Sequence, residues 1–120
     1  MSPTDNSTTV AELRALVDRF VRERDWSQFH SPKNLAMALA IEAAELMEHF
    51  QWLEVADSRQ VAHQPEKLAA VAEELSDVLA YTLAMANSLG IDLSQSLHTK
   101  MVKNALKYPA DEYRGRHGGK

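Results

Sequence analysis

The feature that most constrains the fold is the spacing of apolar residues, which recur at helical intervals in four segments with no alternating strand pattern between them. Start and stop signals delimit these segments. The first predicted helix covers residues 9–25, and the second runs from Ser31-Pro32 through Phe50. The third runs from Pro65 to Leu89-Gly90, and the fourth from residues 92–94 to just before Pro109. The sequence therefore predicts an all-α fold, a four-helix bundle.

The ends of these helices carry recognisable capping residues. Thr9 followed by Glu12 is a capping-box signature, and Ser31 before Pro32 combines a good N-cap with a residue tolerated at the first helical position. Gly90 is the usual kind of helix terminator. A polar segment, residues 57–64, connects the second and third helices. We predict one domain over residues 1–109 and a flexible tail over residues 110–120, which hold three of the four glycines and no apolar period.

Composition excludes several classes of protein. The 120 residues fit one domain, there is no cysteine for disulfide or thiolate chemistry, and the net charge of −4 gives no indication of binding to duplex nucleic acid. No apolar run approaches the roughly 20 residues of a membrane span, and the first residues lack the layout of a signal peptide. We therefore expect no membrane association and a cytoplasmic location.

Two pairs of acidic residues lie inside the most apolar stretches of the second and third helices. Glu42 and Glu45 are three residues apart in LAIEAAELM, and Glu74 and Asp77 are three apart in EELSDVLAY. Residues at this spacing share a helix face, and like charges there repel. A solvated face of an amphipathic helix would explain one such pair. Two pairs on consecutive helices favour a metal site built from carboxylates on facing helices.

The chemistry of the four carboxylates indicates the metal. An oxygen-only ligand set favours a hard cation, Mg²⁺ or Mn²⁺, over Zn²⁺. Such a site suits the hydrolysis of a phosphoanhydride, in which divalent cations neutralise phosphate oxygens and lower the pKa of an attacking water. The chain has no glycine-rich phosphate-binding loop, so cations and lysines must bind the phosphates instead.

The arrangement E-x-x-E on one helix and E-x-x-D on the next resembles the all-α nucleoside triphosphate pyrophosphohydrolases of the MazG-like superfamily. Four segments carry the resemblance in order, and they look most like the dCTP pyrophosphatase branch. They are RERDWSQFHSPKNL, EAAELMEHFQW, EELSDVLAYTLAMANSLGIDL and KMVKNALKYP, within residues 10–109. The resemblance implies a four-helix bundle of the MazG-like type that hydrolyses a nucleoside triphosphate, dCTP or a 5-modified dCTP, to the monophosphate and pyrophosphate.

The resemblance also implies roles for individual residues. Those that match Mg²⁺ ligands, with catalytic roles, are Glu42, Glu45, Glu74 and Asp77. Those that match substrate-binding positions are Trp26, His30 and Trp52 around the base and sugar, and Tyr81, Lys100 and Asn104 near the triphosphate or sugar. Val17 stands where animal relatives carry a histidine near the base.

Each supporting residue also has a purely structural interpretation. Trp26 and Trp52 can be packing residues at helix ends, although aromatic faces also stack on nucleobases. His30 can simply precede a helix, and a buried tyrosine such as Tyr81 usually makes a hydrogen bond across the core. Lys100 lies on a charged helix face, which is usually only solvated, yet lysine is a standard phosphate ligand.

The sequence leaves alternative functions and the assembly open. A broad-specificity or dUTP-directed enzyme of the same superfamily, and a non-enzymatic helical interaction module, are the alternatives to a dCTP pyrophosphohydrolase. The second and third helices are apolar on several sides, which one small bundle cannot cover. We therefore expect a homo-oligomer, and the relatives suggest a tetramer built as a dimer of dimers.

Overall fold

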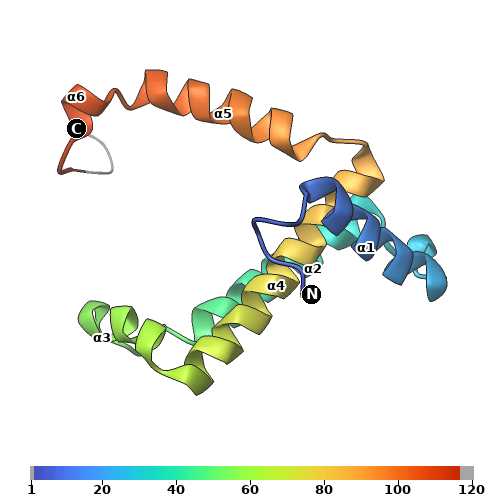
Figure 1. The fold of residues 1–120 in the computed structure, drawn as a ribbon, viewed down its shortest axis with the longest axis horizontal. Coiled ribbons are helices and arrows are strands. Elements are labelled where there is room, and N and C mark those ends of the chain that lie inside the picture. The colour runs from blue at the N-terminus through green and yellow to red at the C-terminus, as the bar shows by residue number, and fades with distance from the viewer. Residues whose placement is uncertain (1, 117–120) are drawn as a thin grey trace. The chain divides into compact units, whose positions relative to one another are not determined.

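The computed structural model describes residues 2–116, and within them the secondary structure is entirely helical. The elements are α1 (Val10–Glu23), the 3₁₀ helix η1 (Ser27–Phe29), α2 (Pro32–Glu48), α3 (Val55–Gln60), the 3₁₀ helix η2 (Val61–His63), α4 (Pro65–Leu89), α5 (Leu93–Lys107) and α6 (Ala110–Tyr113) (Figure 1). The predicted all-α class is confirmed, and α1, α2, α4 and α5 are the four predicted helices.

The predicted capping residues account for the helix ends. The Thr9 hydroxyl accepts from the Glu12 backbone N–H at 3.1 Å, and the Glu12 carboxylate accepts from the Thr9 N–H at 3.3 Å. Ser31 accepts from the Asn34 N–H at 3.1 Å at the start of α2. After α4 the chain turns at Gly90, whose φ of 67° lies in the left-handed region that glycine adopts without strain.

Two segments differ from the sequence prediction. The polar connection after α2 contains the short helices α3 and η2, because Val61 is buried and anchors η2 against α4. The predicted tail begins with a one-turn helix, α6, where the ring of Tyr108 meets that of Tyr113 edge-to-face at 5.2 Å. Residues 117–120 of the predicted tail lie outside the described residues.

The chain divides into two compact units, residues 1–90 and 91–120. The first unit contains α1 to α4, and the second contains α5 and α6. The single domain predicted over residues 1–109 stays a prediction.

Within the first unit, α4 runs back alongside α2, and α1 packs against α4 (Figure 1). Leu35 of α2 is only 1% exposed, and Leu83, Ala84 and Ala86 of α4 are also buried, as is Val21 of α1. The alanines leave room for the helices to approach closely, since a methyl group is the smallest side chain that fills a helix interface. This packing brings the acidic stretch of α2 to face that of α4.

Large apolar side chains remain exposed on the outer faces of α2 and α4. Met47 is 65% exposed and Leu75 is 55% exposed. Leu75 lies at the meeting point of two open apolar hollows, one along α2 and α4 and one along α4 alone. None of the helices within residues 2–116 combines the length and hydropathy of a membrane-spanning segment.

Candidate active site

Three carboxylates converge where α2 faces α4. Glu42 and Glu45 lie one turn apart on α2, and Glu74 lies opposite them on α4. One oxygen from each lies within 4.8 Å of those of the other two. We call Glu42, Glu45 and Glu74 the carboxylate cluster.

Two oxygens of the carboxylate cluster are buried without a hydrogen-bond partner. They are Oε2 of Glu42 and Oε2 of Glu74, and no donor within residues 2–116 reaches either. An unpaired buried carboxylate oxygen is costly, so it calls for a proton or a cation. The ligand set contains only carboxylate oxygens, which suits Mg²⁺ or Mn²⁺. The residues present therefore fit a hard divalent cation.

The crowding raises the pKa of two members of the cluster. The pKa of Glu42 rises from 4.5 to about 7, first because a hydrogen bond with Glu45 favours the protonated carboxyl, then because of desolvation and the charges of Glu45, Asp77 and Glu74. The pKa of Glu74 is also raised, chiefly by desolvation and then by the charge of Glu45. Without a cation, the cluster therefore retains protons that isolated carboxylates would release.

Asp77, the fourth predicted ligand, lies outside the carboxylate cluster. It is exposed on α4, and its oxygens are not among the three that converge within 4.8 Å. Its charge nevertheless contributes to the raised pKa of both Glu42 and Glu74, so it lies within electrostatic reach of the cluster. The structure thus brings together three of the four predicted ligands and leaves Asp77 at their edge.

A cavity of about 140 Å³ lies between α1, η1 and α4. Its lining consists of Val17, Asp18 and Val21 from α1, Ser27 and His30 from the η1 region, and Ala84, Asn87 and Ser88 from α4. We call it the α1–α4 cavity.

One face of α4 connects the carboxylate cluster to the α1–α4 cavity. Glu74, Asp77, Tyr81, Ala84 and Ser88 follow one another at spacings of three or four residues, which places them in one stripe along the helix. Glu74 and Ala84 are ten residues apart, about 15 Å along the helix axis. Tyr81 lies between them, and its ring centroid is 6.4 Å from that of His30. The carboxylate cluster and the α1–α4 cavity thus lie at two points along the same face of α4.

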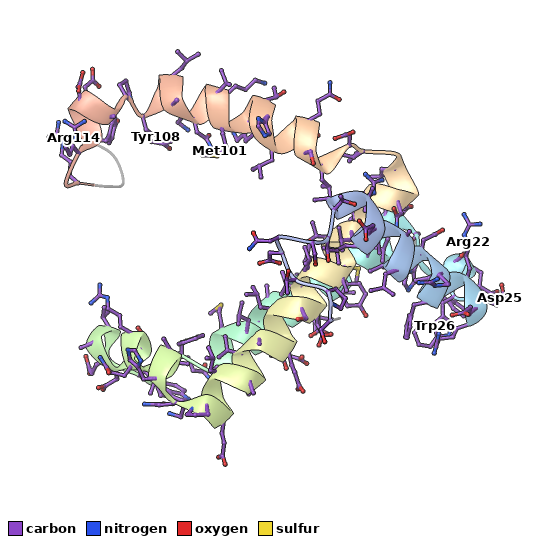
Figure 2. The ribbon with its side chains drawn as sticks, viewed as in Figure 1. Arg22, Asp25, Trp26, Met101, Tyr108 and Arg114 are labelled. Atoms are coloured by element: carbon purple, nitrogen blue, oxygen red, sulfur yellow. The ribbon has the colours of Figure 1, made fainter. Side chains whose placement is uncertain are left out.

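The two predicted tryptophans are not part of the cavity lining. Trp26 packs its ring edge-to-face on Phe20 at 5.7 Å and is 43% exposed, while Trp52 is 87% exposed. Figure 2 shows Arg22, Asp25 and Trp26 gathered at one end of α1. Asp25 turns the chain there with a φ of 55°, and Gln28 donates to its backbone oxygen at 3.0 Å. Of the predicted base-pocket residues, only His30 lines the cavity.

Lys100 and Asn104 belong to the second compact unit. Both lie on α5, where Lys100 is exposed and lines a shallow surface hollow together with Lys103. Asn104 is partly buried, and its amide nitrogen lies 3.6 Å from the sulfur of Met101. Their roles in substrate binding stay predictions.

Asp18 and Asn87 are among the polar residues of the cavity that were not predicted from the sequence. Arg22 Nε donates to Asp18 Oδ2 at 2.8 Å. Asn87 exchanges two hydrogen bonds with Arg14: Arg14 Nε donates to Asn87 Oδ1 at 3.1 Å, and Asn87 Nδ2 donates to the Arg14 carbonyl at 3.1 Å. An available signal was the asparagine itself, a polar residue inside the apolar run LAMANSL.

Comparison with known proteins gives consistent matches. The MazG-like family matches residues 37–117. dCTP pyrophosphatase 1 of the rat is 45% identical over 107 residues, which cover 89% of this chain and 63% of the rat protein. The human dCTP pyrophosphatase 1 is 43% identical over 102 residues, 85% of this chain and 60% of the human protein. The chain thus spans less than two thirds of the length of these relatives.

The fold also matches a solved structure. A pyrophosphatase from Archaeoglobus fulgidus superimposes with a TM-score of 0.75 at 34% sequence identity, covering 90% of this chain and 99% of the other. The family match contains every member of the carboxylate cluster, and the structural match extends over most of the helices. The chain therefore belongs to the MazG-like family.

Proposed function

We propose that the chain is a Mg²⁺-dependent nucleoside triphosphate pyrophosphohydrolase, acting on dCTP or a 5-modified dCTP and releasing the monophosphate and pyrophosphate. The observation that carries the proposal is the carboxylate cluster with its two unpartnered buried oxygens. The names of the relatives support the substrate class, because the similar mammalian proteins are dCTP pyrophosphatases and the similar solved structure is a pyrophosphatase.

Within this proposal, Glu42, Glu45 and Glu74 would hold the cation, and Asp77 would supply a further carboxylate from the edge of the cluster. Bound Mg²⁺ (or Mn²⁺) would neutralise phosphate oxygens and lower the pKa of water. A carboxylate of the pair on α2, Glu42 or Glu45, accepts the proton of the attacking water, as a general base must lie within hydrogen-bond reach of that proton.

The stripe along α4 orients the substrate in this proposal. The triphosphate lies at the carboxylate cluster, Tyr81 contacts the sugar region, and the base enters the α1–α4 cavity beside His30. The stacking roles of Trp26 and Trp52 and the phosphate- or sugar-binding roles of Lys100 and Asn104 stay predictions from the sequence. Removal of unwanted nucleotides from the cytoplasmic pool is the biological purpose that this activity serves.

Product analysis tests the proposed reaction directly. With Mg²⁺ and a panel of nucleoside triphosphates in ¹⁸O water, we expect dCTP or its 5-methyl form to be the preferred substrate. Attack at the α-phosphorus places the label on the monophosphate and leaves pyrophosphate unlabelled. Mass spectrometry of the products distinguishes the outcomes: free phosphate as the first product contradicts the reaction, and a preference for dUTP or for all triphosphates equally contradicts the substrate.

Replacing Glu74 by Gln tests the metal site. The amide keeps the shape of the side chain but removes a charge from the cluster, so we expect Mg²⁺-dependent turnover to fall about a hundredfold or more. Mg²⁺ should also no longer raise the thermal unfolding temperature. Circular dichroism checks that the variant remains helical. The matched control is Glu73→Gln, the exposed neighbour on α4; equal losses in both variants would rule out a specific role for Glu74.

The raised pKa values predict how the metal-free protein responds to pH. Glu42 holds its proton up to about pH 7 in the folded chain but only to about 4.5 when unfolded, and Glu74 is shifted in the same direction. The folded state therefore binds more protons between these values, and its free energy of unfolding falls as the pH rises through this range. Saturating Mg²⁺ should weaken or reverse this dependence, since the cation takes the place of the protons.

Urea denaturation of chelator-treated protein at about pH 5 and about pH 8, with and without Mg²⁺, measures this effect. The Glu42→Gln variant serves as the comparison, because it cannot titrate at this position and should show a shallower decline. A metal-free protein that gains stability across the same interval would contradict the assignment of the shifted groups.

We also propose that the chain assembles as a homotetramer, a dimer of dimers. The exposed apolar surface of α2 and α4, including Met47 and Leu75, is the kind of patch that soluble monomers rarely leave uncovered. Light scattering should give a mass of several chains, and Leu75→Lys should reduce it while circular dichroism stays helical. The control is Lys67→Leu on the same helix. A monomeric native chain with full activity would exclude the assembly.

A further inference from the structure

The α1–α4 cavity contains two polar side chains whose hydrogen-bonding character is fixed by neighbours. We propose that Asp18 and Asn87 recognise the edge of the substrate base, and that they make the site prefer a base bearing an amino group over the same base bearing a keto oxygen. The inference rests on the proposed function, because it places the base of the nucleotide in this cavity.

The size of the cavity suits a single ring. Its volume is about 140 Å³, and a buried cavity of about 150 Å³ is known to hold one benzene molecule. A pyrimidine is a six-membered ring of the same size. Three of the lining residues, Val17, Val21 and Ala84, are aliphatic, and these walls cannot pair with the polar edge of a base. Recognition of that edge must come from the remaining lining residues.

Most of those remaining residues do not discriminate between an amino and a keto group. The hydroxyls of Ser27 and Ser88 donate as well as accept, and they rotate to suit either partner. A neutral imidazole carries one donor and one acceptor and its tautomer can change, so a histidine side chain can meet either group. These groups can hold a base without distinguishing cytosine from uracil.

Asp18 is different because an ionised carboxylate only accepts hydrogen bonds. Arg22 Nε donates to its Oδ2 at 2.8 Å, which leaves Oδ1 as the second acceptor of the carboxylate. An exocyclic amino group can donate to this oxygen. A keto oxygen in the same place would meet a second acceptor, with no proton between them. Asp18 therefore favours the amino base by attraction and disfavours the keto base by repulsion.

Asn87 is different because its amide cannot turn over. An isolated asparagine exchanges its oxygen and nitrogen by a half rotation, and so it offers a donor or an acceptor as needed. Here Oδ1 accepts from Arg14 Nε and Nδ2 donates to the Arg14 carbonyl, both at 3.1 Å. A half rotation would place the amino group against the guanidinium and the oxygen against the carbonyl. The two hydrogen bonds with Arg14 thus fix where the oxygen and the nitrogen of the Asn87 amide lie in the cavity.

The experiment compares dCTP with dUTP, which differ at the base only in an amino group against a keto oxygen with its ring proton. Steady-state kinetics give kcat/KM for each substrate, and the native chain should prefer dCTP. In Asp18→Asn we expect the ratio of the two values to fall about tenfold or more, through a higher KM for dCTP and a lower KM for dUTP. Turnover at saturating dCTP should change little, since the carboxylate cluster is intact.

A second variant separates recognition from a structural role. Arg14→Met removes the hydrogen bond from Nε to Asn87 Oδ1, while the backbone carbonyl at position 14 still accepts from Nδ2. The amide is then held by one hydrogen bond in place of two, so the preference should fall, by less than in Asp18→Asn, while kcat for dCTP is retained. The matched control is Arg19→Met, the same change at an exposed position of α1, and it should leave the ratio unchanged. Circular dichroism confirms that each variant is folded.

The outcomes separate this inference from the proposed function. If the native chain prefers dCTP but Asp18→Asn and Arg14→Met keep that preference, the inference is wrong and the proposed function stands. If the native chain prefers dUTP, the inference and the proposed dCTP substrate are both wrong, and only the hydrolysis of triphosphates stands. If the chain hydrolyses no triphosphate, the proposed function fails. Calorimetry with dCMP and dUMP then tests the inference alone: tighter binding of dCMP, lost in Asp18→Asn, supports it, and equal binding of both overturns it.

Discussion

The structure depends on an unfavourable contact, the approach of three carboxylates across the interface of α2 and α4. Like charges at this distance oppose the packing of the two helices, and two of the buried oxygens have no hydrogen-bond partner in the described part of the chain. The apolar contacts around Leu35 and the small alanines of α4 hold the helices together against this repulsion. The raised pKa of Glu42, about 7, is a direct consequence, because the folded chain favours a bound proton where it has no cation.

A single helix face then connects two kinds of chemistry. The turns of α4 carry an anionic group at Glu74, an aromatic ring at Tyr81 and a small side chain at Ala84, in the order in which they lie along the helix. A nucleotide also presents a charged end, a sugar and a base in sequence. Because a helix is rigid over three or four turns, it keeps these environments at a constant spacing, which favours the proposed alignment of substrate along α4.

The two parts of the site differ in what the family comparison covers. The family match begins at residue 37 and so includes the carboxylate cluster, whereas α1 and η1, which form one wall of the α1–α4 cavity, precede it. The carboxylate cluster thus lies inside the family match, and one wall of the cavity is supplied by a part of the chain outside it. A site divided in this way can keep one reaction while the groups around the base vary.

Sequence alone determined the helices and the acidic pairs, because capping residues, apolar spacing and the three-residue interval between carboxylates are local properties. Local spacing places Glu42 beside Glu45, but only the packing of α2 on α4 decided that Glu74 joins them and that Asp77 stays at the edge. The lining of the α1–α4 cavity likewise depends on how the helices pack. The hydrogen bonds between Arg14 and Asn87 join residues 73 positions apart. A local sequence pattern does not predict which distant residue will orient the Asn87 amide. The short helices α3 and η2 also depend on a tertiary contact, the burial of Val61, since so few residues form a stable helix only when other parts of the chain cover them.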